Sequence, residues 1–350
     1  MAEGNRVVTV GVDTHKDAHV AAALDASGAL LGTASFPADA RGYASMVAWM
    51  RAFGRVEAAG VEGTGGYGAG PARALDAAGV RVLEVSAPDR SERRRRGKSD
   101  GIDAEQAARA ALAGTRCAPA KSRCAEMGAL GALEAAYAGA VKARTAALNA
   151  LQAQVVALPE EARAPLRGKG SSELVRACAS MRPGAGSSPE TLAKVALRSL
   201  ARRARMLDEE AKGLEAEIDA LTKALAPSTR SLLGAGPHVA ARLLLAAGAN
   251  VSRLRSEASF SMLCGASPVP VSSGRADRHR LSRAGDRRAN SALYTMAITR
   301  MAHDGRTRSY VARRMSEGKT KKDAIRCLKR YIAREAYRAL AQDMEALGMS

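Results

Sequence analysis

Four carboxylates occur where short apolar runs end or where a helical segment begins. Asp13 ends the first such run, in VGVDTHK, and Glu62 ends another, in GVEGTGGYG. Asp100 and Asp103 lie three residues apart in KSDGIDAEQ, a spacing that places both on one face of a helix. Carboxylate oxygens are the ligands that Mg²⁺ prefers, and Mn²⁺ accepts the same ligands. The four acids therefore predict a divalent-metal site that activates a nucleophile at a phosphodiester.

Each acid also has a simpler explanation. Asp100 can serve as a helix N-cap, and Asp103 is favoured by the helix dipole. Asp13 and Glu62 can be solvent-exposed residues at strand ends. The joint occurrence of four acids at positions that meet in one sheet favours the metal site over four separate explanations.

A mixed sheet has to bring these acids together. Apolar, β-branched runs predict strands at Arg6–Val12, His19–Leu24, Ala29–Phe36, Glu57–Glu62 and Val80–Val85. Helical spacing predicts helices at 40–53, Tyr67–Ala78 and Asp100–Ala113. If the first and fourth strands are neighbours, Asp13 and Glu62 lie side by side at one edge of the sheet. The last helix then supplies the other two acids.

The net charge indicates a polyanionic partner. The 350 residues include 54 Lys and Arg against 35 Asp and Glu, a formal charge of +19. Residues 1–88 carry 7 basic and 9 acidic side chains, so the surplus lies in the rest of the chain. Nucleic acid is the first expectation and an anionic membrane surface the second. With only 3% aromatic residues, a base-stacking platform of the single-strand-binding type is not expected.

Other classes are excluded by what the chain lacks. Its five cysteines are scattered without CxxC spacing, which argues against a disulfide framework or a zinc knuckle. The first residues include Glu3 and no apolar signal core, and no run of 18 apolar residues occurs. We therefore expect a soluble cytosolic protein that is not associated with a membrane.

The middle of the chain shows heptad spacing. Apolar residues recur from Leu130 to Leu158, where Arg144 interrupts one register, and again at Leu207, Leu214, Ile218, Leu221 and Leu225. Arg182–Ser188 (RPGAGSS) reads as a linker between the two helices. The spacing predicts an antiparallel hairpin or a self-associating coiled coil. A plain helical bundle core fits the periodicity equally well.

A glycine-rich turn opens the last third of the chain. Leu232–Ala241 (LLGAGPHVAA) fits a helix–hairpin–helix turn, in which the amides at Gly234 and Gly236 face a phosphate. An ordinary glycine-rich turn between helices is the alternative. The helix predicted at 320–347 is amphipathic and basic.

These motifs together resemble those of a known family. GVDTHK, VEGTGGYG and KSDGIDA, followed by long helices, the GxG turn and SSGRADRHRLSRAGDRRANSAL, look like the insertion-sequence-110 transposases, DEDD-type recombinases related to the Piv and MooV invertases. The resemblance implies an α/β plus all-α fold with three parts. These are a ribonuclease-H-like (RuvC-like) catalytic domain at 1–117, a coiled-coil oligomerisation region at 118–227 and a helical transposase domain at 228–350.

The resemblance also implies roles for individual residues. Asp13, Glu62, Asp100 and Asp103 correspond to the metal-binding tetrad of the family, which uses Mg²⁺ or Mn²⁺. The family's nucleophilic serine precedes a glycine, which points to Ser273 in Ser272-Ser273-Gly274, with its neighbour Ser272 as the alternative. Ser-Ser-Gly is also common in loops. Family members act as tetramers, are guided by a bridge RNA encoded beside the transposase gene, and join donor and target DNA. The resemblance thus implies a bacterial cytoplasmic protein that is associated with the nucleoid.

Several further side chains are candidates for contact with nucleic acid. Lys16 either points a cation towards a bound phosphate or pairs with Asp17. Two arginine-rich stretches are expected to grip phosphates, a solvated charge run being the alternative. Their members are Arg93, Arg94, Arg95, Arg96 and Lys98 in one, and Arg275, Arg278, Arg280, Arg283, Arg287 and Arg288 in the other. His15 and His19 lack a third ligand at metal spacing, so we expect surface or packing roles for them.

The expected activity is that of a guide-RNA-directed DNA transposase that cuts and rejoins strands through a serine–phosphate intermediate. The first rival is a RuvC-like nuclease that hydrolyses branched DNA and needs the tetrad but not Ser273. The second is a basic architectural protein, for which Asp13 and Glu62 are dispensable.

Overall fold

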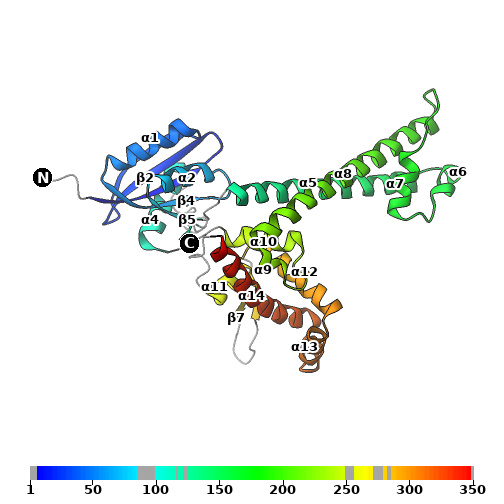
Figure 1. Ribbon diagram of the computed structural model, residues 1–350. Coiled ribbons are helices and arrows are strands. Elements are labelled where there is room, and N and C mark those ends of the chain that lie inside the picture. The colour runs from blue at the N-terminus through cyan, green and yellow to red at the C-terminus, as the bar shows by residue number, and fades with distance from the viewer. Residues whose placement is uncertain are drawn as a thin grey trace. The chain divides into compact units, whose positions relative to one another are not determined.

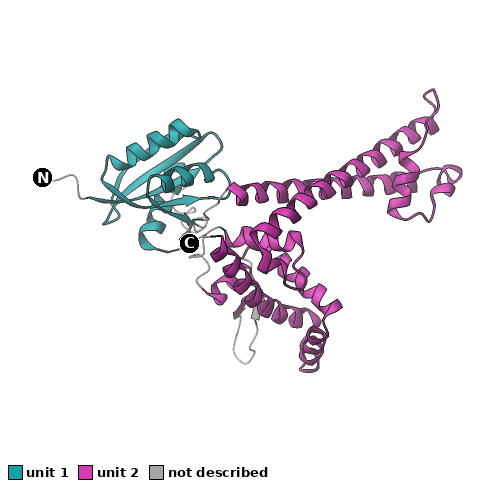
Figure 2. Ribbon diagram, viewed as in Figure 1, with its two compact units in different colours: residues 1–122 teal, residues 123–350 magenta. Residues whose placement is uncertain are grey.

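The chain forms two compact units, Met1–Ser122 and Arg123–Ser350 (Figure 2). The structure is a computed structural model that describes residues 6–85, 99–115, 117–120, 125–248, 256–270, 279–281 and 285–347. The first unit ends close to the predicted domain boundary at residue 117. The boundary predicted at residues 227 and 228 lies inside the second unit and stays a prediction.

The first unit is built on one mixed sheet (Figure 1). Its strands are β1 (Val7–Thr14), β2 (Ala18–Asp25), β3 (Leu30–Pro37), β4 (Arg55–Glu62), β5 (Arg81–Val85) and β6 (Cys117–Pro119), in the order β3-β2-β1-β4-β5-β6. The first three strands pair antiparallel, β4 and β5 run parallel to β1, and β6 is antiparallel to β5. The five predicted strands are confirmed, and β6 is an addition. Its helices are α1 (Ala40–Arg51), α2 (Ala69–Ala77) and α4 (Asp100–Ala113), which confirms the three predicted helices.

Side-chain alternation along β1 separates the core from the candidate site. Val8, Val10 and Val12 are fully buried in a cluster that includes residues of α1 and α2. The residues between them face the opposite side of the sheet, because successive side chains of a strand alternate. On that side α4 packs against β1, β2 and β4. Asp13 therefore belongs to the face that α4 covers.

Two glycines let α4 lie directly on the sheet. A Cβ atom at Gly11 in β1 would stand 2.0 Å from the carbonyl oxygen of Ala104, and one at Gly60 in β4 would stand 2.5 Å from that of Ala107. The helix presents only small residues at this contact, among them Ala104, Ala107 and Ala108, all buried. Helix and strands thus meet backbone to backbone.

The second unit contains a long antiparallel helical hairpin, which we call the helical arm (Figure 1). It comprises α5 (Ala125–Val156) and α8 (Pro189–Leu225), joined through α6 (Glu160–Arg163), a short 3₁₀ turn (Ala164–Leu166) and α7 (Ser171–Ala179). One buried cluster joins Leu130 to Leu225, and another joins Leu151 to Leu197. The antiparallel hairpin is therefore confirmed. Self-association stays a prediction.

The predicted heptad register of α8 is correct only in part. Leu207, Ile218 and Leu225 are buried as expected, but Leu214 and Leu221 are only half-buried. Alanines occupy further buried positions of α8, namely Ala201, Ala204 and Ala211. A register read from leucines alone misses these positions, because a close helix–helix contact is made by small side chains.

A buried acid links the arm to the rest of its unit. Glu134 of α5 is 2% exposed and accepts hydrogen bonds from His238 and from Arg242 Nε, the latter at 3.2 Å. Burial alone would raise the pKa of Glu134, but His238 and Arg242 outweigh it and hold the pKa below its usual value. Tyr137 stacks on His238 with ring centroids 3.9 Å apart.

The remaining elements form a helical body. They are α9 (Pro227–Arg230), α10 (Pro237–Ala247), α11 (Glu257–Leu263), α12 (Arg287–His303), α13 (Gly305–Ser316), α14 (Lys321–Ala346) and a hairpin of β7 (Pro268–Pro270) with β8 (His279–Leu281). Apolar residues of α10, α12 and α14 form its core, with Leu243, Leu244 and Met296 fully buried. The predicted C-terminal helix is confirmed as α14. No helix in the described residues is long and apolar enough to cross a membrane.

The contact between α4 and β1 makes a prediction about stability. Gly11→Ala forces the new methyl group into the backbone of α4 and should lower the free energy of unfolding by about 3 kcal/mol. Gly101→Ala is the matched control, because open space surrounds Gly101 in the same helix; it should raise stability by about 0.5 kcal/mol. Urea unfolding followed by fluorescence of Trp49, the single tryptophan, reports on this unit. Equal effects of the two substitutions would contradict the close contact.

Candidate metal centre

Three of the predicted acids meet where α4 begins above the end of β1. Asp13 is buried, with 9% of its side chain exposed. Asp100 is the first residue of α4, and Asp103, 4% exposed, lies one turn further along the same helix. The N-cap of α4 is Ser99, whose hydroxyl accepts from the amide of Ile102 at 3.4 Å. The alternative that Asp100 is only the N-cap is therefore wrong.

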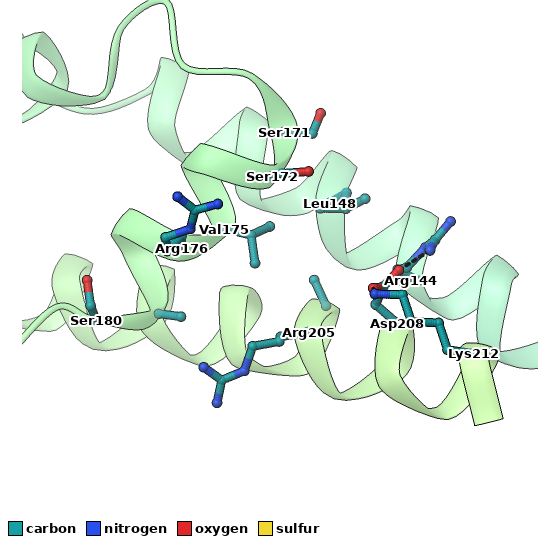
Figure 3. Close-up of a pocket in the computed structure, with 12 residues that line it drawn as sticks. Arg144, Leu148, Ser171, Ser172, Val175, Arg176, Ser180, Arg205, Asp208 and Lys212 are labelled. Atoms are coloured by element: carbon teal, nitrogen blue, oxygen red, sulfur yellow. Dashed lines mark hydrogen bonds and ion pairs between the residues drawn. The ribbon is translucent and has the colours of Figure 1, made fainter.

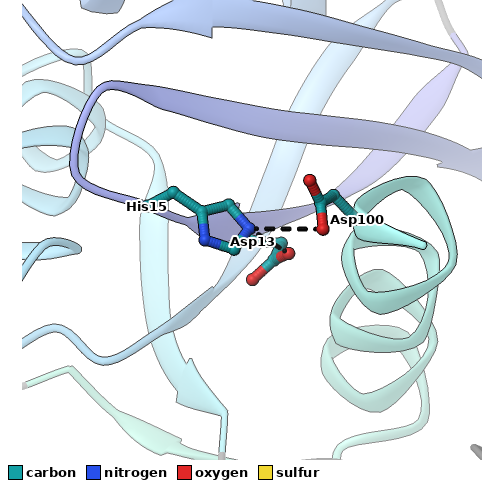
Figure 4. A group of neighbouring side chains, drawn as sticks. All are labelled: Asp13, His15 and Asp100. Carbon is teal, nitrogen blue, oxygen red and sulfur yellow. Dashed lines mark hydrogen bonds and ion pairs between the residues drawn. The ribbon is translucent and has the colours of Figure 1, made fainter. Parts of the chain in front are cut away.

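His15 lies between two of these carboxylates (Figure 4). Its Nε2 is 3.0 Å from Asp13 Oδ2 and 3.5 Å from Asp100 Oδ1. His15 is exposed at the surface as expected, with 48% of its side chain accessible. Its contacts with two carboxylates were not expected, because Asp100 comes from α4 and not from the neighbouring sequence. A signal was present: in Asp-x-His at the end of a strand, both side chains point to the same face of the sheet.

Asp13, His15 and Asp100 can each direct one ligand atom to a common point. These three donor atoms lie within 4.8 Å of one another, and among the described residues they form the candidate metal-binding group. Glu62 ends β4 beside them, one residue after the parallel pair of Val12 and Val61. The hydroxyl of Thr14 donates to the backbone oxygen of Glu62 at 3.1 Å, which ties the two strand ends together. The predicted neighbourhood of the first and fourth strands is thereby confirmed.

The electrostatics of this group favour a cation. Burial raises the pKa of Asp13, and the nearby charges of Asp103 and Asp100 raise it further, while His15 opposes the shift. A divalent cation would offset the repulsion among the carboxylates. Carboxylate oxygens suit Mg²⁺ and Mn²⁺, and an imidazole nitrogen is a ligand more typical of transition metals. The donor set of two carboxylates and one imidazole thus fits a divalent metal ion such as Mg²⁺ or Mn²⁺.

His19 has the packing role expected of it. It is 1% exposed, its ring stacks on Tyr43 with centroids 5.6 Å apart, and its Nδ1 accepts from the amide of His15 at 3.3 Å. Burial lowers the pKa of His19, so the neutral ring is favoured. This contact fixes the backbone of the residue that reaches into the acid cluster.

The glycine-rich turn has a structural explanation in the second unit. Gly234 has a φ of +87°, and a Cβ atom there would stand 3.0 Å from the Cα of Met296 in α12. Gly236 is the N-cap residue of α10. Close packing on α12 accounts for Gly234, while contact of this turn with a phosphate stays a prediction.

The predicted nucleic-acid contacts are only partly covered by the described residues. Lys16 is exposed in the turn between β1 and β2, and Arg287 and Arg288 are exposed in the first turn of α12. β7 and β8 pair antiparallel, and the chain between them carries the serine motif. Outside the described residues, or with side chains outside them, lie Ser272, Ser273, Arg93, Arg94, Arg95, Arg96, Lys98, Arg275, Arg278, Arg280 and Arg283.

Comparison with known proteins gives matches over both units. Residues 10–158 match a sequence model of DEDD-type IS110 transposases, and residues 228–312 match one described as transposase of the IS116/IS110/IS902 family. A Streptomyces coelicolor protein named as the uncharacterized 43.6 kDa protein of insertion element IS110 is 32% identical over 130 residues. The alignment covers 36% of this chain and 32% of that protein, so the chain spans about a third of the length of the curated relative it matches.

The buried charge of Asp13 makes a prediction about stability and metal binding. At neutral pH Asp13→Asn should raise the urea midpoint, because it removes an ionised group that burial disfavours. The gain should disappear as the pH falls through the raised pKa of Asp13 and then its unfolded-state value, where the carboxyl is protonated in both states. Mg²⁺ or Mn²⁺ should stabilise the native protein but not this variant.

Asp17→Asn is the matched control, since Asp17 is exposed in the turn that follows β1. It should leave both the midpoint and the response to metal unchanged. A lower midpoint for Asp13→Asn at neutral pH, or a metal response that survives this substitution, would contradict the metal centre.

Proposed function

Because the chain belongs to the IS110 family of transposases, we propose that it breaks and rejoins DNA strands at the ends and target sites of an insertion element. The observation that carries this proposal is the group of Asp13, His15 and Asp100 at the end of β1. Its donor atoms converge at the edge of the sheet where parallel strands end. Such convergence is unexpected for an architectural protein, which would need no buried acid there.

The first unit is proposed to be a ribonuclease-H-like domain. Supporting this are three antiparallel strands, β1 to β3, followed by β4 and β5 parallel to β1, with α4 packed across β1 and β4. We retain the proposed division of the chain into this domain at 1–117, a coiled-coil region at 118–227 and a transposase domain at 228–350.

The residues that would hold a metal are Asp13, Asp100 and His15, with Glu62 and Asp103 beside them. When bound, Mg²⁺ or Mn²⁺ supplies positive charge that activates a hydroxyl nucleophile and stabilises the leaving oxygen at a phosphodiester. The protein's own part is positioning. His15 holds the carboxylates of β1 and α4 together, and the backbone contact of α4 with Gly11 keeps the two elements from separating.

The nucleophile is proposed to be Ser273, with Ser272 as the alternative. The serine hydroxyl gives up its proton as its oxygen bonds to phosphorus, the bond from phosphorus to the 3′ oxygen breaks, and that oxygen takes up a proton to become a free 3′-hydroxyl. The phosphoserine link conserves the bond energy for rejoining. The support is the Ser-Gly pair within the second family match and its place in the chain between β7 and β8.

The partners are proposed from the family. They are donor DNA, target DNA and a bridge RNA that supplies the sequence recognition, bound by a homotetramer. The basic surplus outside residues 1–88, 47 basic against 26 acidic side chains, supports polyanionic partners.

A covalent-trapping assay tests the mechanism. The full-length protein, Mg²⁺, RNA transcribed from the DNA flanking its gene, and end-labelled element DNA are combined and resolved on a denaturing gel. A protein–DNA adduct is expected, lost in Ser273→Ala and kept in Ser272→Ala. Asp13→Asn should reduce its formation by about 1,000-fold, since it removes a metal ligand.

The same gel identifies the rival activities. Cleaved DNA without an adduct, which survives both serine substitutions but not Asp13→Asn, would identify a hydrolytic nuclease. DNA binding without any cleavage, unchanged in Asp13→Asn, would identify an architectural protein.

A further inference from the structure

A pocket of about 600 Å³ lies in the helical arm, between α5, α7 and α8 (Figure 3). Its volume falls within the range of pockets that enclose small ligands or parts of larger ones. Four cationic side chains line it: Arg144, Arg176, Arg205 and Lys212. The pocket shares no residue with the metal centre, because all of its lining residues belong to the second unit.

The residues that line the pocket include one carboxylate, Asp208, against these four cations. Asp208 pairs with Arg144 and, at 2.7 Å, with Lys212. Arg205 has Glu209 of its own helix 3.7 Å away, and no ion pair of Arg176 occurs among the described residues. The pocket therefore keeps a net positive charge that an anionic ligand would neutralise.

The position of Arg144 is energetically unfavourable for a charged side chain. It stands in the heptad series of α5 with Tyr137 and Leu151, which pack against the rest of the unit, where a coiled coil usually places an apolar side chain. Its Nε is buried and has no hydrogen-bond acceptor within the described part of the chain. An unpaired buried donor lowers stability. The Nη1 atom of the same guanidinium pairs with Asp208, which holds the charge of Arg144 in the wall of the pocket.

The rest of the lining suits a sugar–phosphate unit. Ser171 and Ser172 place two hydroxyl groups in the first turn of α7, where the backbone amides of a helix also attract anions. Leu148, Val175 and Ala204 supply apolar surface. None of the described lining residues is aromatic, so the pocket does not stack a base. Phosphate and sugar are the groups that its side chains can bind.

We propose that this pocket binds the phosphodiester backbone of a nucleic acid strand. The arm as a whole, residues 125–225, carries 14 basic and 12 acidic side chains, so its positive charge is concentrated at the pocket. The hydroxyl groups and apolar surface beside the cations favour a sugar–phosphate strand over a single small anion. The inference rests on the proposal that nucleic acid is a partner of this protein, but not on the cleavage chemistry. RNA and DNA share the backbone phosphate, and the experiment separates them.

Fluorescence anisotropy of the full-length protein, without divalent metal, tests the pocket. Labelled RNA and DNA oligonucleotides of one sequence are titrated at several salt concentrations. The double variant Arg176→Gln/Arg205→Gln should raise Kd about tenfold and reduce the slope of log K against log salt by about 1.4, two single-strand phosphate contacts. A larger loss with RNA than with DNA assigns the strand to RNA, and the reverse assigns it to DNA.

The control is Arg163→Gln/Lys194→Gln, which removes the same charge from the same arm. These residues pair with Glu160 and Glu190 and do not line the pocket. The control should keep the native salt slope, and both double variants should keep the native Tm by circular dichroism. Because the titration contains no divalent metal and reads binding alone, failure of the metal centre and failure of the pocket are distinguishable.

Three results would overturn the proposal. Equal losses in the two double variants would show diffuse attraction to the arm and no pocket site. Unchanged binding by Arg176→Gln/Arg205→Gln would show that these two residues do not contact the nucleic acid. Displacement of the oligonucleotide by orthophosphate at constant ionic strength would assign the pocket to a small free anion.

Discussion

The direct contact of α4 with β1 and β4 is the constraint on which the candidate metal centre depends. Gly11 and Gly60 leave no side chain between helix and sheet, so the start of α4 is held at backbone distance from the strand ends. Strand alternation then places Asp13 on the covered face, and Asp100 begins the helix above it. A larger residue at Gly11 would push α4 away from β1 and so separate Asp100 from Asp13.

The site and the basic surfaces have opposite electrostatic requirements. A cluster of carboxylates attracts a cation but repels a phosphodiester, so the attraction for the strand has to come from other parts of the chain. The composition follows this division: residues 1–88 carry more acidic than basic side chains, and residues 89–350 carry 47 basic against 26 acidic ones. The pocket lined by Arg176 and Arg205 is one place where basic side chains gather around a cavity.

The elements with strong local signals were predictable, and those that tertiary contacts determine were not. The valine-rich run of β1 and the carboxylates at the ends of β1 and β4 were readable from the sequence, and the pairing of these strands is confirmed. β6 contains Pro119 and only three residues, so it is a strand only because β5 pairs with it. The contact of His15 with Asp100 was not predicted, because the two residues are distant in sequence. The register of α8 was predicted only in part, because Ala201, Ala204 and Ala211, whose hydrophobic signals are weak, occupy buried positions that leucine spacing does not indicate.

The charges inside the helical arm constrain how its length can evolve. Glu134 meets His238 and Arg242, and Arg144 meets Asp208, at fixed points along α5. Glu134 has its partners on α10, but sliding α8 along α5 would separate Arg144 from Asp208. An insertion in α5 alone is therefore selected against unless α8 gains a matching segment. Relatives with longer or shorter arms should differ by whole heptads, added to or removed from both helices beyond Arg144.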